Sequence, residues 1–463
     1  IVCANRGEVM KLSKTIFTSF TMLCLLSTFF LVECIISVKA SPTTWTVDDD
    51  GAADFRKVQE AINHAKSEDT IFVRKGTYYE HVIVNKSVSL IGEDRDSTIV
   101  DGSGIGIVID ISAPVNNAKV QGFTLRNGGS GTGLSDSGIL IDHSSGNNIS
   151  HNTIINNFYG ISLESSSGNM ISDNTISLSP FAGLSLSYYS FNNVVSGNTI
   201  TDNSDGISFL LSFNNVVSGN TISSNNDYGI SIYSSHNNVV SGNTISSNSN
   251  YGMYLALGSN DNIIYHNNFN NTYQVGSDSK NVWDNGDEGN YWSDYTGQDL
   301  NGDGIGDTPH DIDVDTQDNH PLMGMFSDFS VTSEGKRYHA TITCNSTISG
   351  FRFEIGPETG NKIIRFNVTG KDGTVGFCRV MIPTELMNYP YIILVGVEEI
   401  VPTLLDVSNE TYAYLYFTYI HSSRTITIIS SLARKLEIDF YNLNATYHAL
   451  LNNYSILLGN YGE

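Results

Sequence analysis

Short segments in which apolar and polar residues alternate recur along the middle of the chain at a fixed interval of 23 residues. Each segment opens with a glycine and continues apolar–polar–apolar, as in residues 160–163 (Gly-Ile-Ser-Leu) and 206–209 (Gly-Ile-Ser-Phe). Alternation of this kind predicts a β-strand with one buried face, and an internal repeat of this length is typical of a solenoid. The repeat glycines are Gly160, Gly183, Gly206, Gly229 and Gly252, and Gly138 opens an earlier copy.

One repeat unit has room for two or three short strands joined by tight turns, but not for a helix of about ten residues. The residues between the alternating triplets are mostly Asn, Ser and Gly, which favour turns. Each unit therefore predicts one coil of a parallel β-helix, bonded to the next coil at the ordinary strand spacing of ~4.8 Å. Two stacked apolar ladders should fill the interior: Ile161, Leu184, Ile207, Ile230 and Met253, and Leu163, Leu186, Phe209, Ile232 and Leu255.

A second repeated motif, Asn-Thr-Ile, runs in phase with the glycines. We expect each of its asparagines to lie inside a turn, with the side-chain amide bonded to the coils above and below. Such a ladder supports the structure and is not a ligand site. The motif begins at Asn152, Asn174, Asn198, Asn220 and Asn243, and a variant begins at Asn267.

The segments before the repeats have the features of a solenoid cap, which must cover the apolar end of the first coil. Phe55, Val58 and Ile62 fall on one face of a predicted capping helix, and irregular first coils follow over residues 70–92. This helix and the run GTYYEHVIVNKSVSLIG (residues 76–92) resemble the N-terminal part of pectin methylesterases.

The later coils, such as NNVVSGNTISSNNDYGISIYSS (residues 214–235), resemble the NosD-like repeat family, which is also described as carbohydrate-binding and sugar-hydrolysis repeats. The resemblance covers roughly residues 44–324 and implies an all-β, right-handed parallel β-helix. The same scaffold carries lyases, hydrolases, esterases and inert adhesive rods, so it does not specify a function.

The catalytic signatures of related enzyme families are missing from the sequence. The paired Asp and Arg signature of pectin methylesterases has no counterpart, and neither has the Asn-Thr-Asp, Asp-Asp, His-Gly and Arg-x-Lys set of polygalacturonases. The NosD name suggests copper, but the chain has no cluster of thioether and imidazole groups, and its closest Met pair is Met323 and Met325. We therefore predict no copper site.

Acidic residues form two groups on the predicted coils. Four residues after each repeat glycine, the outward series places Asp142 and Glu164 on adjacent coils, with His143 beside them. Two such carboxylates can share a proton, hold calcium, or act as acid and nucleophile on a glycoside. They can equally be solvated turn residues, as can the second group, Asp202, Asp205 and Asp227, on the turns before the glycines.

Aromatic residues gather where the strands turn outward. They can serve as stacking platforms for sugar rings, or they can form a stacked ladder that only seals the corner of the solenoid, which we favour. The residues are Tyr188, Tyr189, Phe191, Phe213 and Tyr233.

The charge balance limits the partners of the chain. Its 463 residues include 24 Lys and Arg against 48 Asp and Glu, which gives a formal net charge of −24. So acidic a chain is a poor partner for nucleic acid or an anionic membrane. Residues 138–270 contain no Lys or Arg, which disfavours uronate polymers as substrates.

Residues 1–40 have the features of a secretory signal peptide or an N-terminal anchor. The chain is almost wholly apolar from residue 16 to residue 38, and Val38-Lys39-Ala40 resembles a cleavage site. We therefore expect a secreted or cell-surface protein. Cys344 and Cys378 are the two cysteines beyond this leader, so we predict a disulfide, with two separate buried thiols as the alternative. Eight Asn-x-Ser/Thr sequons agree with export.

A motif with calcium-ligand spacing follows the repeats within a predicted cap over residues 276–325. Residues 299–307 (Asp-Leu-Asn-Gly-Asp-Gly-Ile-Gly-Asp) match the first nine positions of an EF-hand-type loop, which resembles the loops of dockerins. At position 12 His310 replaces Glu, so Asp311 or Asp313 would have to complete the shell; an acidic Gly-rich turn is the alternative. We predict a structural Ca²⁺ held by Asp299, Asn301, Asp303, the carbonyl of Ile305, and Asp307.

Two further segments complete the chain. Residues 326–431 alternate in the manner of strands and predict an immunoglobulin-like β-sandwich. Residues 435–463 carry apolar residues at heptad spacing, which predicts a helical stalk that self-associates or a lone amphipathic helix packed on the sandwich. The chain starts at Ile1 and ends at Glu463, so we expect a fragment from which a membrane anchor can be missing.

These observations favour an exported cell-surface β-helix protein that binds glycan or forms part of the envelope without catalysis. The alternative is a polysaccharide lyase or glycoside hydrolase that acts through Asp142, Glu164 and His143. A purely structural adhesin is a third possibility, and it predicts assembly through the stalk without glycan binding.

Overall fold

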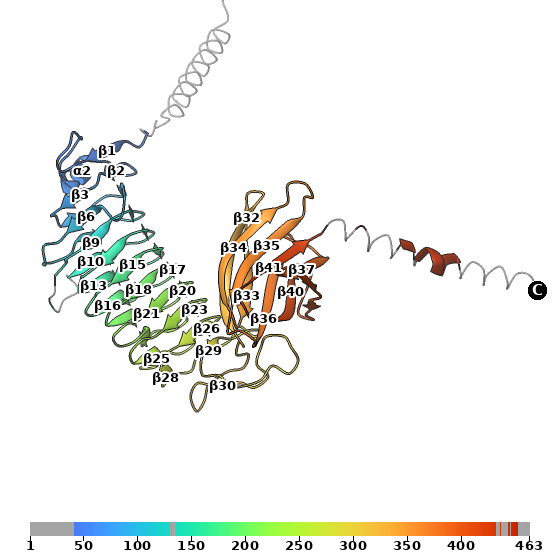
Figure 1. Ribbon diagram of the computed structural model, residues 1–463. Coiled ribbons are helices and arrows are strands. Elements are labelled where there is room, and N and C mark those ends of the chain that lie inside the picture. Colours follow the sequence, from blue (N-terminus) through green and yellow to red (C-terminus); the bar gives the residue numbers. More distant parts are fainter. Residues whose placement is uncertain are drawn as a thin grey trace, which may run out of the picture. The chain divides into compact units, whose positions relative to one another are not determined.

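The computed structural model describes residues 41–129, 131, 136–431, 436, 443–444 and 446–451 (Figure 1). The predicted leader at residues 1–40 and most of the heptad segment at residues 435–463 lie outside the described residues. Four described residues of the heptad seam, Leu436, Leu443, Tyr447 and Leu450, are exposed. Within the described part of the chain, no helix is long and apolar enough to cross a membrane.

Three parallel sheets, A, B and C, form a β-helix in which each sheet receives one strand from each regular coil (Figure 1). Sheet A contains β1 (Thr44–Val47), β2 (Thr70–Val73), β5 (Ser89–Gly92), β8 (Lys119–Gln121), β11 (Asn148–Ser150), β14 (Met170–Ser172), β17 (Val194–Ser196), β20 (Val216–Ser218), β23 (Val239–Ser241) and β26 (Ile263–Tyr265). Sheet B contains β3 (Gly76–Tyr78), β6 (Thr98–Asp101), β9 (Thr124–Arg126), β12 (Thr153–Ile155), β15 (Thr175–Ser177), β18 (Thr199–Thr201), β21 (Thr221–Ser223), β24 (Thr244–Ser246), β27 (Asn268–Asn270) and β29 (Tyr291–Trp292). Sheet C contains β4 (Val82–Ile83), β7 (Ile109–Ser112), β10 (Ser137–Asp142), β13 (Tyr159–Glu164), β16 (Ala182–Ser187), β19 (Asp205–Leu210), β22 (Ile230–Tyr233), β25 (Tyr251–Ala256) and β28 (Tyr273–Ser277).

The register between coils confirms the two predicted apolar ladders. Ile161 pairs with Leu184 and Leu163 pairs with Leu186 between β13 and β16, and the pairing continues coil by coil to Met253. All members of both ladders are fully buried. The interior is therefore a continuous apolar core, which supplies the main driving force for folding.

The repeat glycines are required by close packing at the start of each sheet C strand. A Cβ atom on Gly206 would stand 2.4 Å from the carbonyl oxygen of Gly229 and 2.6 Å from Cγ2 of Ile222. Gly183 and Gly229 have the same surroundings one coil away on either side. Any side chain at these positions would push the coils apart, which explains the fixed period of the glycines.

Stacked asparagines hold the turns, as the Asn-Thr-Ile motif predicts. Asn198 donates from its backbone N and from Nδ2 to Oδ1 of Asn220, at 2.9 and 3.0 Å, and Nδ2 also donates to the carbonyl of Ile171. Each neighbour along the ladder repeats this pattern. Two further ladders were not predicted: Asn147, Asn169, Asn193, Asn215, Asn238, Asn262 and Asn281, and Asn203, Asn225, Asn248 and Asn271.

Helix α2 (Val58–His64) covers the first coil and buries Val58, Ala61 and Ile62. The Glu80 carboxylate accepts the free backbone N–H groups of Val58 and Gln59, at 2.9 and 3.0 Å. At the other end, Lys86 Nζ donates to three helix carbonyls. Residues of the first coils thus satisfy both helix ends with charges of the favourable sign.

Indole rings close the other end of the solenoid. Trp283 and Trp292 are buried, and Trp292 stacks on Phe269 of β27, the preceding strand of sheet B, with ring centroids 4.5 Å apart. The chain then forms a small hairpin of β30 (His310–Asp311) and β31 (Gln317–Asp318).

Two antiparallel sheets, D and E, pack over a second apolar core. The immunoglobulin-like relationship of this sandwich stays a prediction. Sheet D contains β32 (Met325–Ser333), β33 (Lys336–Cys344), β36 (Val375–Pro383), β40 (Tyr412–Ile420) and β39 (Thr403–Leu404), and sheet E contains β34 (Thr347–Ile355), β35 (Lys362–Thr369), β41 (Arg424–Ser430), β37 (Tyr391–Val395) and β38 (Glu398–Ile400).

A buried polar chain joins the cap to the sandwich. Arg379 of β36 donates from Nε and Nη2 to Glu288 Oε1, both at 2.8 Å, and Glu288 Oε2 lies 2.8 Å from His266 Nε2. The His266 ring stacks on Phe326 at 3.9 Å. Although burial opposes ionisation, His266 and Arg379 hold the pKa of Glu288 below its ordinary value.

Candidate functional site

The outer face of sheet C carries the candidate residues that the sequence places on the coils. Strand alternation directs every second side chain of β10 through β25 away from the core. The register confirms that the predicted outward residues, four positions after each repeat glycine, stack from coil to coil. A second stacked series, here called the middle column, lies two positions after each glycine. The predicted series is Asp142, Glu164, Ser187, Leu210, Tyr233 and Ala256, and the middle column is Leu140, Ser162, Ser185, Ser208, Ser231 and Tyr254.

Asp142, Glu164 and His143 come together as predicted. Asp142 pairs with Glu164 in the register of β10 and β13, and His143 Nδ1 lies 2.5 Å from Asp142 Oδ1. Burial raises the pKa of Glu164, and the charge of Asp142 raises it further, against a smaller effect of His143. Glu164 Oε1 and the Oγ of the fully buried Ser162 are shielded from solvent without a hydrogen-bond partner.

Asp142 and Glu164 provide the two carboxyl groups that catalysis by an acid and a carboxylate requires. Neighbouring coils stand ~4.8 Å apart, which is close to the separation of about 5 Å between the carboxyl groups of retaining glycosidases. The two carboxyl groups differ in their surroundings, because burial raises the pKa of Glu164 whereas Asp142 pairs with a histidine.

The second acidic group is only partly assembled. Asp205 accepts a 2.7 Å hydrogen bond from Ser231 Oγ, and burial raises its pKa to about 6 against that bond and a weak one from the Tyr228 N–H. The charge of Asp227 adds to this shift. Asp202, in contrast, is an exposed residue of a turn.

Tyrosines surround Asp205, and three of them, Tyr228, Tyr251 and Tyr254, were not predicted from the sequence. The Tyr228 and Tyr254 rings stack at 4.9 Å, and Tyr233 lies 6.0 Å from Tyr254. Burial and the neighbouring Tyr228 and Asp205 raise the pKa of Tyr233. The available signal was a tyrosine immediately before the repeat glycine, at Tyr228 and Tyr251, and one two residues after it, at Tyr254.

The predicted aromatic group divides into two kinds of residue. Phe191, Phe213 and His236 form a corner stack with centroids 5.9 and 5.7 Å apart, which confirms the predicted stacking of the two phenylalanines. Tyr188 and Tyr189 instead have 44% and 61% of their surface exposed, and both have positive φ angles of 50° and 67°. Bulky residues rarely adopt this conformation, which costs free energy.

The predicted calcium loop is tightly wound around its first carboxylate. Asp299 accepts backbone N–H groups from Gly302, Asp303 and Gly304 at 2.8 to 3.0 Å. Asp303 Oδ1 accepts the Ile305 N–H, and Asp307 accepts the Leu300 N–H. The donor set is made of hard oxygens and fits Ca²⁺.

Among the described residues, the loop carboxylates do not form a group of three within 4.8 Å; the group that does is Asp48, Asp49 and Asp50.

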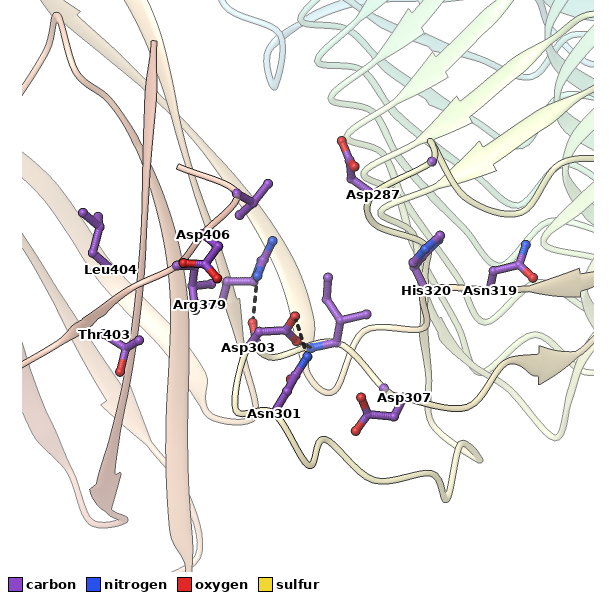
Figure 2. A pocket seen from close by; sticks show the side chains of 15 residues that line it. Asp287, Asn301, Asp303, Asp307, Asn319, His320, Arg379, Thr403, Leu404 and Asp406 are labelled. Atoms are coloured by element: carbon purple, nitrogen blue, oxygen red, sulfur yellow. Dashed lines mark hydrogen bonds between the residues drawn. The ribbon is translucent and has the colours of Figure 1, made fainter. Parts of the chain in front are cut away.

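A cleft of about 620 Å³ lies beside this loop and was not predicted (Figure 2). Asn301, Asp303 and Asp307 come from the loop, and Arg379 and Asp406 come from the sandwich. Arg379 Nη1 donates to the Asp303 carbonyl at 2.8 Å, so the loop is fixed to the sandwich. The cleft lining includes four aspartates together with other polar and apolar side chains.

Cys344 and Cys378 face each other between β33 and β36, with their sulfur atoms 3.5 Å apart. They are free thiols in the structure, so the disulfide stays a prediction. The hydrogen bond from Cys378 lowers the pKa of Cys344 to about 7, and burial raises that of Cys378. Beside them, Ser346 Oγ lies 2.7 Å from His421 Nε2, but both residues are buried inside the sandwich.

The architecture and the outer face define a parallel β-helix protein whose side chains present carboxylates and tyrosines along one sheet. The family described as "Periplasmic copper-binding protein (NosD)" matches residues 65–297, which is half of the chain. The chain belongs to the NosD family.

A cell surface glycoprotein of Methanothermus fervidus is 35% identical over 107 residues, which are 22% of this chain and 16% of that protein. The chain thus matches less than a fifth of that relative's length. Among solved structures, the periplasmic alginate epimerase AlgG has a TM-score of 0.38 at 18% identity, over 47% of this chain and 60% of the other. ORF18 of Geobacillus virus E2 has a TM-score of 0.40 at 13% identity, over 81% and 74%. No activity follows from these structural likenesses.

Within the residues that the structure describes, no cluster of cysteine, histidine or methionine side chains matches the copper in the family description. Residues 65–297 contain no cysteine, and of their two methionines Met253 is buried in the core while Met170 is exposed. The three-carboxylate group at Asp48 offers hard oxygens, which suit other cations. The residues do not fit copper.

Proposed function

We propose that this chain is a cell-surface or envelope β-helix protein that binds a glycan on the outer face of sheet C. The observation that carries the proposal is the arrangement of that face, where half-buried tyrosines stand beside carboxylates and the exposed Tyr188 and Tyr189 directly follow β16. Rings supply apolar faces for sugar stacking, and carboxylates accept hydrogen bonds from sugar hydroxyls. A rigid sheet positions such groups better than a loop does.

Strained aromatic residues support this proposal. Tyr188 and Tyr189 keep positive φ angles and remain exposed, although asparagine or glycine would adopt this conformation at lower cost. Two exposed rings held in this costly conformation favour a role in binding. The likeness to a cell surface glycoprotein supports the location, as does the sequence of the predicted leader.

The test is retention of the full chain on a panel of immobilised polysaccharides. A Tyr188→Ala, Tyr189→Ala double variant should lose at least tenfold in affinity for any polymer that retains the parent, since each stacked ring contributes about 1 kcal/mol. Tyr412→Ala serves as the matched control, because Tyr412 is an exposed tyrosine of the sandwich. No retention on any polymer would reject the proposal.

A second candidate function is glycoside hydrolysis or lyase chemistry at Asp142 and Glu164. The buried, unpartnered Glu164 Oε1 beside the half-buried Asp142 carboxylate favours it. Release of new reducing ends or unsaturated products by the parent, and its loss in an Asp142→Ala, Glu164→Ala variant, would establish this activity.

We also propose that the loop at residues 299–307 binds Ca²⁺ as a structural staple of the cap. The Asp299 hydrogen bonds pre-form the turn, and the Arg379 contact to Asp303 connects it to the sandwich. Self-association through residues 435–463 and a Cys344–Cys378 disulfide remain further proposals for an exported chain.

A further inference from the structure

Each acidic cluster of the outer face stands beside tyrosines. The charge of Glu164 and the neighbouring Tyr188 act on Tyr159, whose pKa burial raises to about 12. After burial and Tyr228, the charge of Asp205 contributes to the raised pKa of Tyr233. Ser231 of the middle column donates a hydrogen bond to the Asp205 carboxylate. Carboxylates beside aromatic rings attract cations by both their charge and the ring quadrupole.

No Lys or Arg side chain from this stretch of the sequence balances these carboxylates. Residues 138–270 contain seven Asp and Glu and no Lys or Arg, so the potential over this part of the solenoid is negative. The exposed His143 lies beside Asp142, and it carries a positive charge only when it is itself protonated. The field repels uronate or sulfated polymers and attracts positively charged ones.

Two buried acceptors add a second, independent indication of a ligand. Glu164 Oε1 and the Oγ of Ser162 lack partners, although buried polar atoms are nearly always bonded. Both lie on β13, in adjacent outward columns of the face. An N–H or O–H donor seated there would satisfy them.

We infer that the outer face of sheet C recognises a polysaccharide whose sugar units carry positively charged ammonium groups, primary or quaternary. This assignment rests on the glycan-binding function proposed above and names the class of glycan. Ammonium groups pair with the carboxylates of Glu164 and Asp205, and the sugar rings stack on the neighbouring tyrosines. Strands β13 and β19 are two coils apart, about 10 Å along the solenoid, so one polymer chain can reach both clusters.

The test compares two soluble probes on the full chain by isothermal titration. One is N-trimethyl chitosan, whose charge does not change with pH, and the other is a neutral N-acetylated chitin oligosaccharide. We expect the cationic probe to bind at least tenfold more tightly at low salt. A Glu164→Gln, Asp205→Asn variant should lose that preference.

The matched control is Asp173→Asn, Asp261→Asn, which removes the same charge from exposed turns of the solenoid away from the outer face. It should retain the preference. Binding of the cationic probe should also tighten from pH 5 to pH 7, as Asp205 ionises near pH 6 in the presence of Asp227 and the adjacent tyrosines.

The outcomes separate the two proposals. Equal binding of both probes would overturn the ammonium assignment and leave glycan binding in place, whereas no binding of either would overturn both. Polylysine provides a third arm. If it binds as tightly as the chitosan derivative, and the Tyr188→Ala, Tyr189→Ala variant binds both unchanged, the face is a general cation surface and the assignment is wrong.

Discussion

At the scale of single residues, Asp318 shows how the ladder of Asn-Thr-Ile asparagines ends after Asn267 and Asn290. Each asparagine of the ladder both accepts and donates, so another residue must always follow it. Asp318 takes the next position and accepts from the Asn290 N–H at 2.7 Å, from Trp292 Nε1 at 2.9 Å and from the His320 N–H at 3.0 Å. A carboxylate only accepts hydrogen bonds, so the ladder stops there without an orphaned donor.

The buried position of Asp318 predicts a measurable pH effect. Burial raises its pKa to about 6 from 3.8, so the stability from its bound proton is complete below pH 3.8 and is lost as the pH rises through 6. The stability of the parent relative to Asp318→Asn should therefore fall between pH 4 and pH 7, by up to about 3 kcal/mol. Urea unfolding at both pH values measures this difference.

The control is Asp315→Asn, at an exposed position of the same hairpin. Its stability difference from the parent should stay constant over this range. A pH-independent difference for Asp318→Asn would show that the carboxyl titrates normally.

Sequence reasoning located residues that follow the coil period and missed those that do not. The outward position of Asp142 and Glu164 follows from counting four residues past a glycine, and the structure confirms it. Tyr228 and Tyr254 were missed because they fall at other offsets. Glu288 and Arg379, 91 residues apart, meet through tertiary packing that no local pattern records.

At the scale of elements, the asparagine ladders are the most repetitive support of the solenoid. Asn220 accepts from two donors of Asn198 and donates to Val195, Ser218 and Asn243, all inside the turn. Asn220→Ala would leave several of these groups buried without hydrogen-bond partners. Each such group lowers the free energy of unfolding by about 1–3 kcal/mol.

We expect Asn220→Ala to lower the free energy of unfolding by about 3 kcal/mol or more, measured by denaturant titration. The exposed neighbour Asn226 gives the control, and Asn226→Ala should change stability by less than about 0.5 kcal/mol. Similar values for both variants would mean that water replaces the ladder bonds.

The proposed calcium staple predicts a metal-dependent stability of the cap. Ca²⁺ at about 100 times its dissociation constant should stabilise the parent by about 2.7 kcal/mol, and a chelator should remove that gain. Asp303→Ala should abolish the response, whereas Asp278→Ala, outside the loop, should retain it. A calcium-independent melting temperature in the parent would contradict the staple.

The strands could be predicted because alternation and turn residues repeat in every coil. Pairing in the sandwich could not be predicted, since antiparallel partners such as β33 and β36 are separated by other strands. The stalk at residues 435–463 is untested because most of it lies outside the described residues.

At the scale of the whole molecule, the buried chain Arg379–Glu288–His266 couples the solenoid cap to the sandwich. The Arg379 and Glu288 side chains are 4% and 9% exposed, so removal of the cation leaves an uncompensated buried carboxylate. Arg379→Met should therefore cost about 3–5 kcal/mol and expose residues 276–325 to proteolysis.

Limited proteolysis with mass spectrometry measures that exposure. Lys336→Met breaks an exposed pair with Glu385 on the same sandwich and should leave the cleavage pattern unchanged. An unchanged pattern in Arg379→Met would mean that apolar packing alone joins the two parts.

The most direct measurement of the central claim is a crystal structure of the full chain with an oligosaccharide of a polymer that it retains. The account predicts density along the outer face of sheet C, with sugar rings on Tyr188 or on the tyrosines around Asp205. A sugar bound only in the cleft beside the calcium loop, or only on the sandwich, would contradict it.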